Sequence, residues 1–224
     1  NGGTIKKLKL TGFSVSAAAF SGALVGSNAG LIEDVLVSGT MTGLTYSGSQ
    51  TINLGSLVTV PPMILAMGVG MEAGKITNME VTGTLNAPVA DFVGGAAAFV
   101  VDAMAAIDDS GMFVHHFTIT GHASVGGIVG ITQVGGSGIL IRDSVVSNST
   151  VTAVGPTQTL GQTHAGGAIA SLEGNASNIS VSHVTVTGVE LAGGVMAKLQ
   201  TETSTVTQLT ALDVTVTANA RAAG

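Results

Sequence analysis

The chain of 224 residues contains no cysteine and no tryptophan, and only 9% of its residues are charged. The absence of cysteine excludes a disulfide scaffold, a cysteine-ligated zinc site and a cysteine nucleophile. Seven basic residues and a net charge of −6 argue against a nucleic-acid-binding protein, which needs a basic surface. A hydrophobic content of 45% together with this low charge excludes an intrinsically disordered chain.

Long apolar runs are also absent, because no stretch reaches the ~18–20 residues of a membrane-spanning helix. The nearest, 92–107, contains Asp102. The sequence starts at Asn1 without a basic segment followed by an apolar one, so we expect a mature secreted protein or an excised segment. Four prolines and no charged or Ser/Pro-rich linker predict one domain over residues 1–224.

Glycine is abundant, with 33 positions, and it accompanies a repeated segment. Each copy has an apolar start, a polar middle, a β-branched residue, a serine or threonine, and a small or turn-forming end. This pattern is typical of a half-buried strand followed by a turn. It occurs at six places: 31–39, 75–83, 113–121, 139–148, 179–188 and 209–218.

Two columns emerge when the six copies are aligned at their ends. The first is β-branched throughout and consists of Val37, Val81, Ile119, Val146, Val186 and Val216. The second carries hydroxyls and consists of Ser38, Thr82, Thr120, Ser147, Thr187 and Thr217. A glycine-flanked apolar run such as 126–130 precedes each copy and predicts a short buried strand. The alanine-rich segment 89–107 leaves a helix open as an alternative.

Short strands repeated in this way predict an all-β fold, a β-helix (β-solenoid) of about six irregular coils. A β-sandwich or barrel also has turn-separated strands, but it has no reason to repeat one strand six times. The low aromatic content of 3% fits a narrow interior filled by valine, isoleucine and alanine. Segments 43–56 and 154–163, rich in Gly, Ser, Thr and Gln, are expected to be loops.

Residues 22–43, GALVGSNAGLIEDVLVSGTMTG, resemble the GLUG-type repeat of bacterial surface proteins. Similar segments occur at 74–85 and at 125–130 with 139–148. The resemblance implies a right-handed β-helix in a secreted or surface-anchored, adhesin-like protein, and it brings no catalytic residues with it. The unequal spacing of the repeats departs from a regular array of this kind.

Residues that could perform chemistry are few. The adjacent acids at 33–34 and 108–109 could serve a polysaccharide-processing enzyme, but neighbours on a strand point to opposite faces, so a solvated surface is the simpler interpretation. No metal-binding histidine spacing, nucleophile elbow or phosphate loop is present. We therefore predict no enzyme and no catalytic, cofactor or metal residue. Chance or strand solubility explains a set of aligned polar residues, Asp34, Asn78, His115, Asp143 and Asp213.

The first functional hypothesis is an extracellular or cell-surface structural protein. The strand edges at the two ends of a solenoid can bind further strands, and contact between unlike ends grows a filament. We expect a homopolymer, or a surface-adhesin module, without nucleic acid and without a transmembrane segment. The expected assembly contacts are Lys6, Lys7, Lys9, Leu209, Val214 and Val216.

The second hypothesis is ligand binding by hydroxyl residues on one face. Thr-x-Thr segments at 118–120, 185–187 and 215–217 look like ice-binding surfaces, and carbohydrate is the other ligand considered. When the repeats are aligned at their closing residues, Leu36 and Glu80 interrupt the threonine array in the first two repeats. The expected ladder consists of Thr82, Thr120, Thr187 and Thr217.

Overall fold

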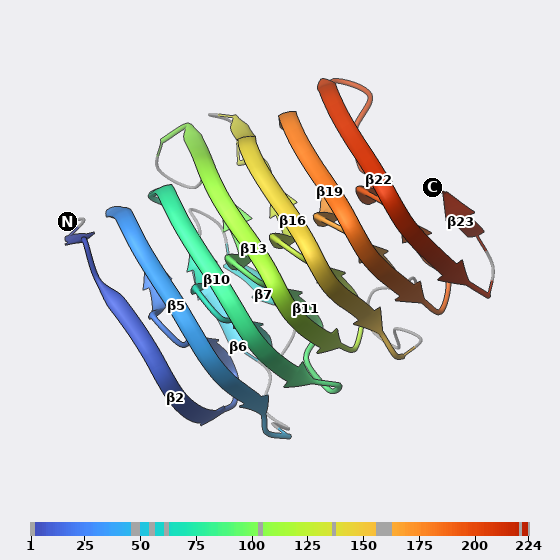
Figure 1. Ribbon diagram of the computed structural model, residues 1–224. Helices are drawn as coiled ribbons and strands as arrows, with labels where there is room; N and C mark the ends of the chain where they lie inside the picture. The colour runs from blue at the N-terminus through green and yellow to red at the C-terminus, as the bar shows by residue number, and fades with distance from the viewer. Residues whose placement is uncertain are drawn as a thin grey trace.

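The computed structural model describes residues 3–45, 50–53, 57–60, 63–102, 105–135, 138–155, 163–219 and 221–223. These residues form strands that stack in parallel into three sheets, and one short antiparallel hairpin. The predicted all-β solenoid is confirmed, and Figure 1 shows its strands running side by side from blue to red. The right-handed winding implied by the resemblance stays a prediction.

The first sheet contains one long strand from each coil, and its edge also holds the short strand β1 (Thr4–Lys6). Each of the six predicted segments lies within one long strand. A seventh, the first, was not part of the predicted repeat. The long strands are β2 (Lys9–Ala17), β5 (Leu31–Gly43), β10 (Lys75–Ala87), β13 (Ile107–Gly121), β16 (Ile139–Ala153), β19 (Asn175–Gly188) and β22 (Val206–Ala218).

The other two sheets are built from the glycine-flanked runs, each of which forms two short strands rather than one. The second sheet contains β3 (Phe20–Gly22), β8 (Ile64–Ala66), β11 (Phe92–Gly94), β14 (Ser124–Gly126), β17 (His164–Gly166), β20 (Leu191–Gly193) and β23 (Arg221–Ala223). The third contains β4 (Val25–Asn28), β9 (Val69–Glu72), β12 (Ala97–Val101), β15 (Val129–Gln133), β18 (Ile169–Leu172) and β21 (Met196–Leu199).

A sharp corner separates the two short strands of a coil. At the corner between β14 and β15, a Cβ built on Gly126 would lie 1.9 Å from the carbonyl oxygen of Val129, so the backbone there leaves no room for a side chain. The helix alternative for 89–107 is wrong, because β11 and β12 lie there. Two further strands, β6 (Gln50–Asn53) and β7 (Leu57–Val60), form the antiparallel hairpin. Much of the predicted loops 43–56 and 154–163 lies outside the described residues.

Stacked aliphatic side chains form the core. Alternate residues of each long strand point inward, and residues at the same register position lie on top of one another in successive coils. One such column is fully buried from β5 to β19: Met41, Leu85, Ile119, Val151 and Val186. Burial of apolar surface is the main force that stabilises a fold, and here each coil shields the next.

Two bends divide the long strands, and both depend on left-handed backbone conformations. At the first bend, seven residues in register have φ between 51° and 65°: Lys7, Asp34, Asn78, Gly111, Asp143, Asn178 and Gln208. Glycine, asparagine and aspartate tolerate this conformation best. The amide of Asn78 donates to the Asp34 carboxylate over 2.6 Å, and that of Asn178 donates to Asp143 over 2.8 Å.

A second bend follows five residues later in five of the long strands, at Gly12, His116, Asn148, His183 and Asp213. Between the first bend and the threonine or serine pair at the end of the strand, β5 and β10 have one residue fewer than the other long strands. The pairing therefore shifts by one residue where β5 meets β2 and where β10 meets β13. The left-handed backbone at the bends thus explains why polar residues align there, an alignment that we ascribed to chance or strand solubility from the sequence alone. Asp34, Asn78 and Asp143 belong to the first bend and Asp213 to the second, while His115 precedes it.

Serine hydroxyls replace strand hydrogen bonds at these bends. The hydroxyl of Ser149 accepts from the backbone N–H of Phe117 (3.2 Å) and donates to the carbonyl of Ser147 (2.7 Å). At the first bend, Ser144 makes the same pair of bonds, to the N–H of Met112 and the carbonyl of Arg142. A buried backbone N–H left without an acceptor is costly, so these serines allow the chain to bend inside a packed stack.

Candidate binding face

The observed strand register differs from the alignment of repeat ends. Gly39 and Gly83 are not strand ends, because β5 and β10 continue for four residues beyond them. Their true counterpart in β13 is Phe117, not Gly121. Each predicted column therefore divides in two, and the β-branched column separates into Val37, Val81 and Val146 on one side and Ile119, Val186 and Val216 on the other.

The corrected register reveals a two-column array beyond the second bend, with a hydroxyl residue at every position except Asn86. Every long strand contributes two outward residues separated by one buried residue. One column consists of Ser14, Thr40, Thr84, Thr118, Thr150, Thr185 and Thr215. The other consists of Ser16, Thr42, Asn86, Thr120, Thr152, Thr187 and Thr217. We call these fourteen residues the threonine face.

The threonine face is regular, uncharged and accessible. All fourteen side chains are exposed or half-exposed. No hydrogen bond or ion pair ties any of them to another residue in the described part of the chain. Rows lie ~4.8 Å apart across the strands, and the two columns ~6.6 Å apart along them, as parallel-sheet geometry requires. Each threonine presents a methyl group and a hydroxyl, so the face offers alternating apolar and hydrogen-bonding positions.

Three residues of the predicted ladder, Thr120, Thr187 and Thr217, lie in the second column of this face. Thr82 does not, because it lies between the two bends, where its hydroxyl donates to that of Ser38 over 2.8 Å. Leu36 and Glu80 pair with each other in yet another column, so they do not interrupt the array. Thr82 was placed in the ladder because the repeats were aligned at their ends and not at the inward residues of each coil.

The residues predicted for assembly lie at the two edges of the first sheet. Lys6, in β1, and Lys9, in β2, flank Lys7 at one edge, while Leu209, Val214 and Val216 lie on β22 at the other. Lys6 forms an ion pair with Glu33 of the adjacent strand. Figure 1 shows β2 and β22 at opposite ends of the stack.

The adjacent acids behave as strand geometry requires. Asp108 points outward and accepts from Arg142 Nε over 2.7 Å; this hydrogen bond lowers the pKa of Asp108. Its neighbour Asp109 is fully buried. No group of three or more potential metal-ligating side chains occurs among the described residues, nor does any helix there that is long and apolar enough to cross a membrane.

A buried pair of acids, Glu72 and Asp109, escaped prediction. Both side chains have zero exposure, and both Glu72 carboxylate oxygens accept from the Asn28 amide over 2.9 Å. Burial raises the pKa of Glu72 from 4.5 to about 7. Burial, and then the nearby charge of Glu72, raises the pKa of Asp109 well above its ordinary value. A correct register would have revealed Asp109, because it pairs with the buried Ile141, and its carboxylate accepts from the backbone N–H of Ile76 over 2.7 Å.

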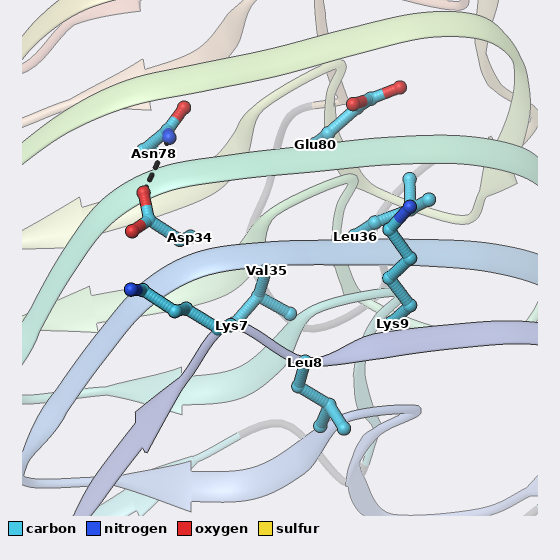
Figure 2. Close-up of a pocket in the computed structure, with 8 residues that line it drawn as sticks. All are labelled: Lys7, Leu8, Lys9, Asp34, Val35, Leu36, Asn78 and Glu80. Atoms are coloured by element: carbon cyan, nitrogen blue, oxygen red, sulfur yellow. Dashed lines mark hydrogen bonds between the residues drawn. The ribbon is translucent and has the colours of Figure 1, made fainter.

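An open hollow of about 410 Å³ lies over the first bend near the β2 edge (Figure 2). Lys7 and Lys9 line it together with Asp34 and Glu80, and the hydrogen bond from Asn78 to Asp34 crosses one side. Because the hollow is lined by charges of both signs and by side chains that face solvent, its polar groups do not converge on one point where a ligand could bind. The threonine face is therefore the better candidate for binding.

No family model matches the chain, and no curated protein or solved structure shows significant similarity to it.

Proposed function

We propose that the protein is a non-enzymatic binding module whose threonine face adsorbs to ice. The observation that carries the proposal is the double column across all seven long strands, in which thirteen of the fourteen residues carry a hydroxyl and Asn86 is the exception. A soluble ligand needs only a few such positions. A face repeated over seven rows suits a ligand that is itself periodic, and the ice surface is a regular lattice of hydrogen-bonding oxygen atoms.

β-Propensity alone does not account for the threonines. It favours threonine at exposed strand positions in general. Two outward columns between the bends belong to the same strands, and neither is made of threonine. One is mixed: Lys9, Leu36, Glu80, Phe113, Val145, Ser180 and Thr210. The other has only two threonines among serine, histidine and leucine: Thr11, Ser38, Thr82, His115, Ser147, Ser182 and Leu212. Threonine is therefore concentrated in one segment of the sheet, which favours a role for that segment over a general preference of strands.

Ice suits the chemistry of the face better than a carbohydrate does. Protein surfaces that hold sugars commonly offer aromatic rings or charged and amide side chains, and the threonine face has no rings, no charges and a single amide, that of Asn86. Hydroxyl and methyl groups in a fixed, closely spaced pattern order water instead. The backbone hydrogen bonds of seven paired strands hold this pattern rigid, so little conformational entropy is lost on adsorption.

Thermal hysteresis, the gap between the melting and freezing points of a small ice crystal, tests this proposal. The wild-type chain is expected to show it. Thr118→Lys places a long charged side chain in the middle of the face, and we expect roughly ten-fold less activity, equivalent to about 1.4 kcal/mol of adsorption free energy.

The matched control is Phe113→Lys, which adds the same side chain to the same strand at an outward position between the bends, where Phe113 is 40% exposed. This variant should keep the wild-type activity. Absence of hysteresis in the folded wild-type chain, or an equal loss in both variants, contradicts ice binding by this face.

A second candidate function is that of an extracellular structural protein that assembles end to end, or a surface-adhesin module. It is favoured by exposed leucines on the last coil, since Leu209 and Leu212 are 39% and 56% exposed. The resemblance to GLUG-type repeats supports a location outside the cell for either function. Negative-stain images of the purified chain should then show fibres, whereas isolated short rods at every concentration contradict assembly.

A further inference from the structure

We infer that the outer edge of β22 binds the outer edge of β1–β2 of a second copy in one defined register, with Leu209 of the first copy stacked on Leu8 of the second. The inference rests on the second proposed function, association through the end strands. It specifies the partner, the surface and the register.

The two edges have the same backbone geometry. The first bend and the first threonine-face residue are seven positions apart at the β1–β2 edge, from Lys7 to Ser14, and also in β22, from Gln208 to Thr215. In β5, the strand that β2 pairs with, this spacing is one residue shorter. The edge of β2 is therefore shaped like β13, β16, β19 and β22, and it can continue their stack without the register shift that it makes with β5.

The side chains that this register brings together are apolar. Each core column of the first sheet begins and ends with a hydrophobic residue, so a second copy would extend all six. The facing pairs, with the β22 end first, are Val206 and Ile5, Leu209 and Leu8, Ala211 and Leu10, Val214 and Phe13, Val216 and Val15, and Ala218 and Ala17.

Leu8 and Leu209 identify this contact most clearly. They lie at the two ends of the core column that contains the buried Val35 and Ile179. They are nevertheless 40% and 39% exposed, because no described strand covers them. Figure 2 shows the Leu8 side chain pointing away from β5, beyond the edge strand. A leucine from a second copy would complete its burial, and the removal of apolar surface from water favours the contact.

The same register joins the threonine faces of the two copies. Ser14 and Ser16 of the second copy would lie beside Thr215 and Thr217 of the first, which continues both columns without a gap. The second sheet would also continue, by β3 of the second copy pairing with β23. The third sheet would not continue, because among the described residues the last coil, which contains β22 and β23, contributes no strand to that sheet. Association would thus lengthen the binding face as well as bury the end strands.

Charge substitution in the paired leucines tests the register. The wild-type chain should associate in a concentration-dependent way in sedimentation velocity. Leu8→Lys and Leu209→Glu should each weaken self-association roughly 100-fold, because each buries an unpaired charge in the contact. In an equimolar mixture, the unchanged Leu209 edge of the first variant can meet the unchanged Leu8 edge of the second. The mixture should therefore associate through the wild-type contact, although each variant alone associates weakly.

Val89→Lys is the control, because Val89 is also 40% exposed but lies in the turn after β10, away from both edges. It should associate like the wild type. Circular dichroism confirms that each variant folds. Leu8→Glu with Leu209→Lys forms a second pair of variants, in which the positive and negative charges are exchanged between the two edges. If the wild type associates and all variants do too, another surface is responsible and this register is overturned. If the wild type stays monomeric at every concentration, association itself is overturned too.

Discussion

Replacing Phe117 with alanine is expected to destabilise the protein by about 3–5 kcal/mol, the usual cost of deleting a buried ring. The ring is 1% exposed and belongs to the main core cluster. Its register neighbours are Gly83 on one side and Ser149 on the other, and neither has a side chain large enough to fill the space it would leave. A cavity would therefore remain in the centre of the stack.

Denaturant unfolding followed by circular dichroism measures this loss. Phe113→Ala is the control in the same strand, because Phe113 is 40% exposed and should cost less than about 1 kcal/mol. Equal losses in the two variants would mean that the inward and outward sides of β13 are assigned wrongly.

The second large effect is a loss of stability as the pH rises, caused by the buried acids. Glu72 has a folded-state pKa of about 7, above its ordinary 4.5, so the folded protein binds this proton more tightly than the unfolded chain does. Stability from this group is present below pH 4.5 and is lost as the pH rises toward 7. The expected loss is about 3 kcal/mol, since each pH unit corresponds to about 1.4 kcal/mol. Asp109, also raised, acts in the same direction.

A buried histidine opposes this trend. Burial lowers the pKa of His164 to about 4, so its contribution to stability is lost as the pH falls from 6.5 toward 4. The comparison of wild type with Glu72→Gln isolates the acid, because His164 contributes equally to both curves. The free energy of unfolding of the wild type, relative to the variant, should decrease between pH 4.5 and pH 7. A constant difference over this range would show that Glu72 is ionised in the folded protein.

The sequence was sufficient for the fold, because the alternation of inward and outward residues survives in every repeat. Segments such as 139–148 and 179–188 have a period of two on each side of a bend, which is enough to indicate a half-buried strand, and both lie within observed strands. The glycine-flanked runs were recognised as buried strands. Their division by a corner, as at Gly126, was not predicted, because a strand of three residues has no periodicity to read.

The register could not be read from the repeats, because the bends change the residue count within a strand. Between the first bend and the threonine face, β13 has one residue more than β10, and nothing in the composition marks His116 as the additional one. A one-residue shift moves every side chain to the other face of a sheet. Alignment at the closing glycines set Gly83 against Gly121 instead of Phe117, and this concealed the threonine face in β5 and β10.

Direct observation of the protein on ice tests the central claim, binding by the threonine face. Because the chain has no cysteine, Gln133→Cys on the exposed end of β15 provides a single labelling site away from this face. The labelled protein should accumulate on a single ice crystal and remain there when the surrounding solution is exchanged. The same protein carrying Thr118→Lys should wash away. Exclusion of the labelled wild-type protein from the ice surface, with the label uniform in the liquid, would contradict the account.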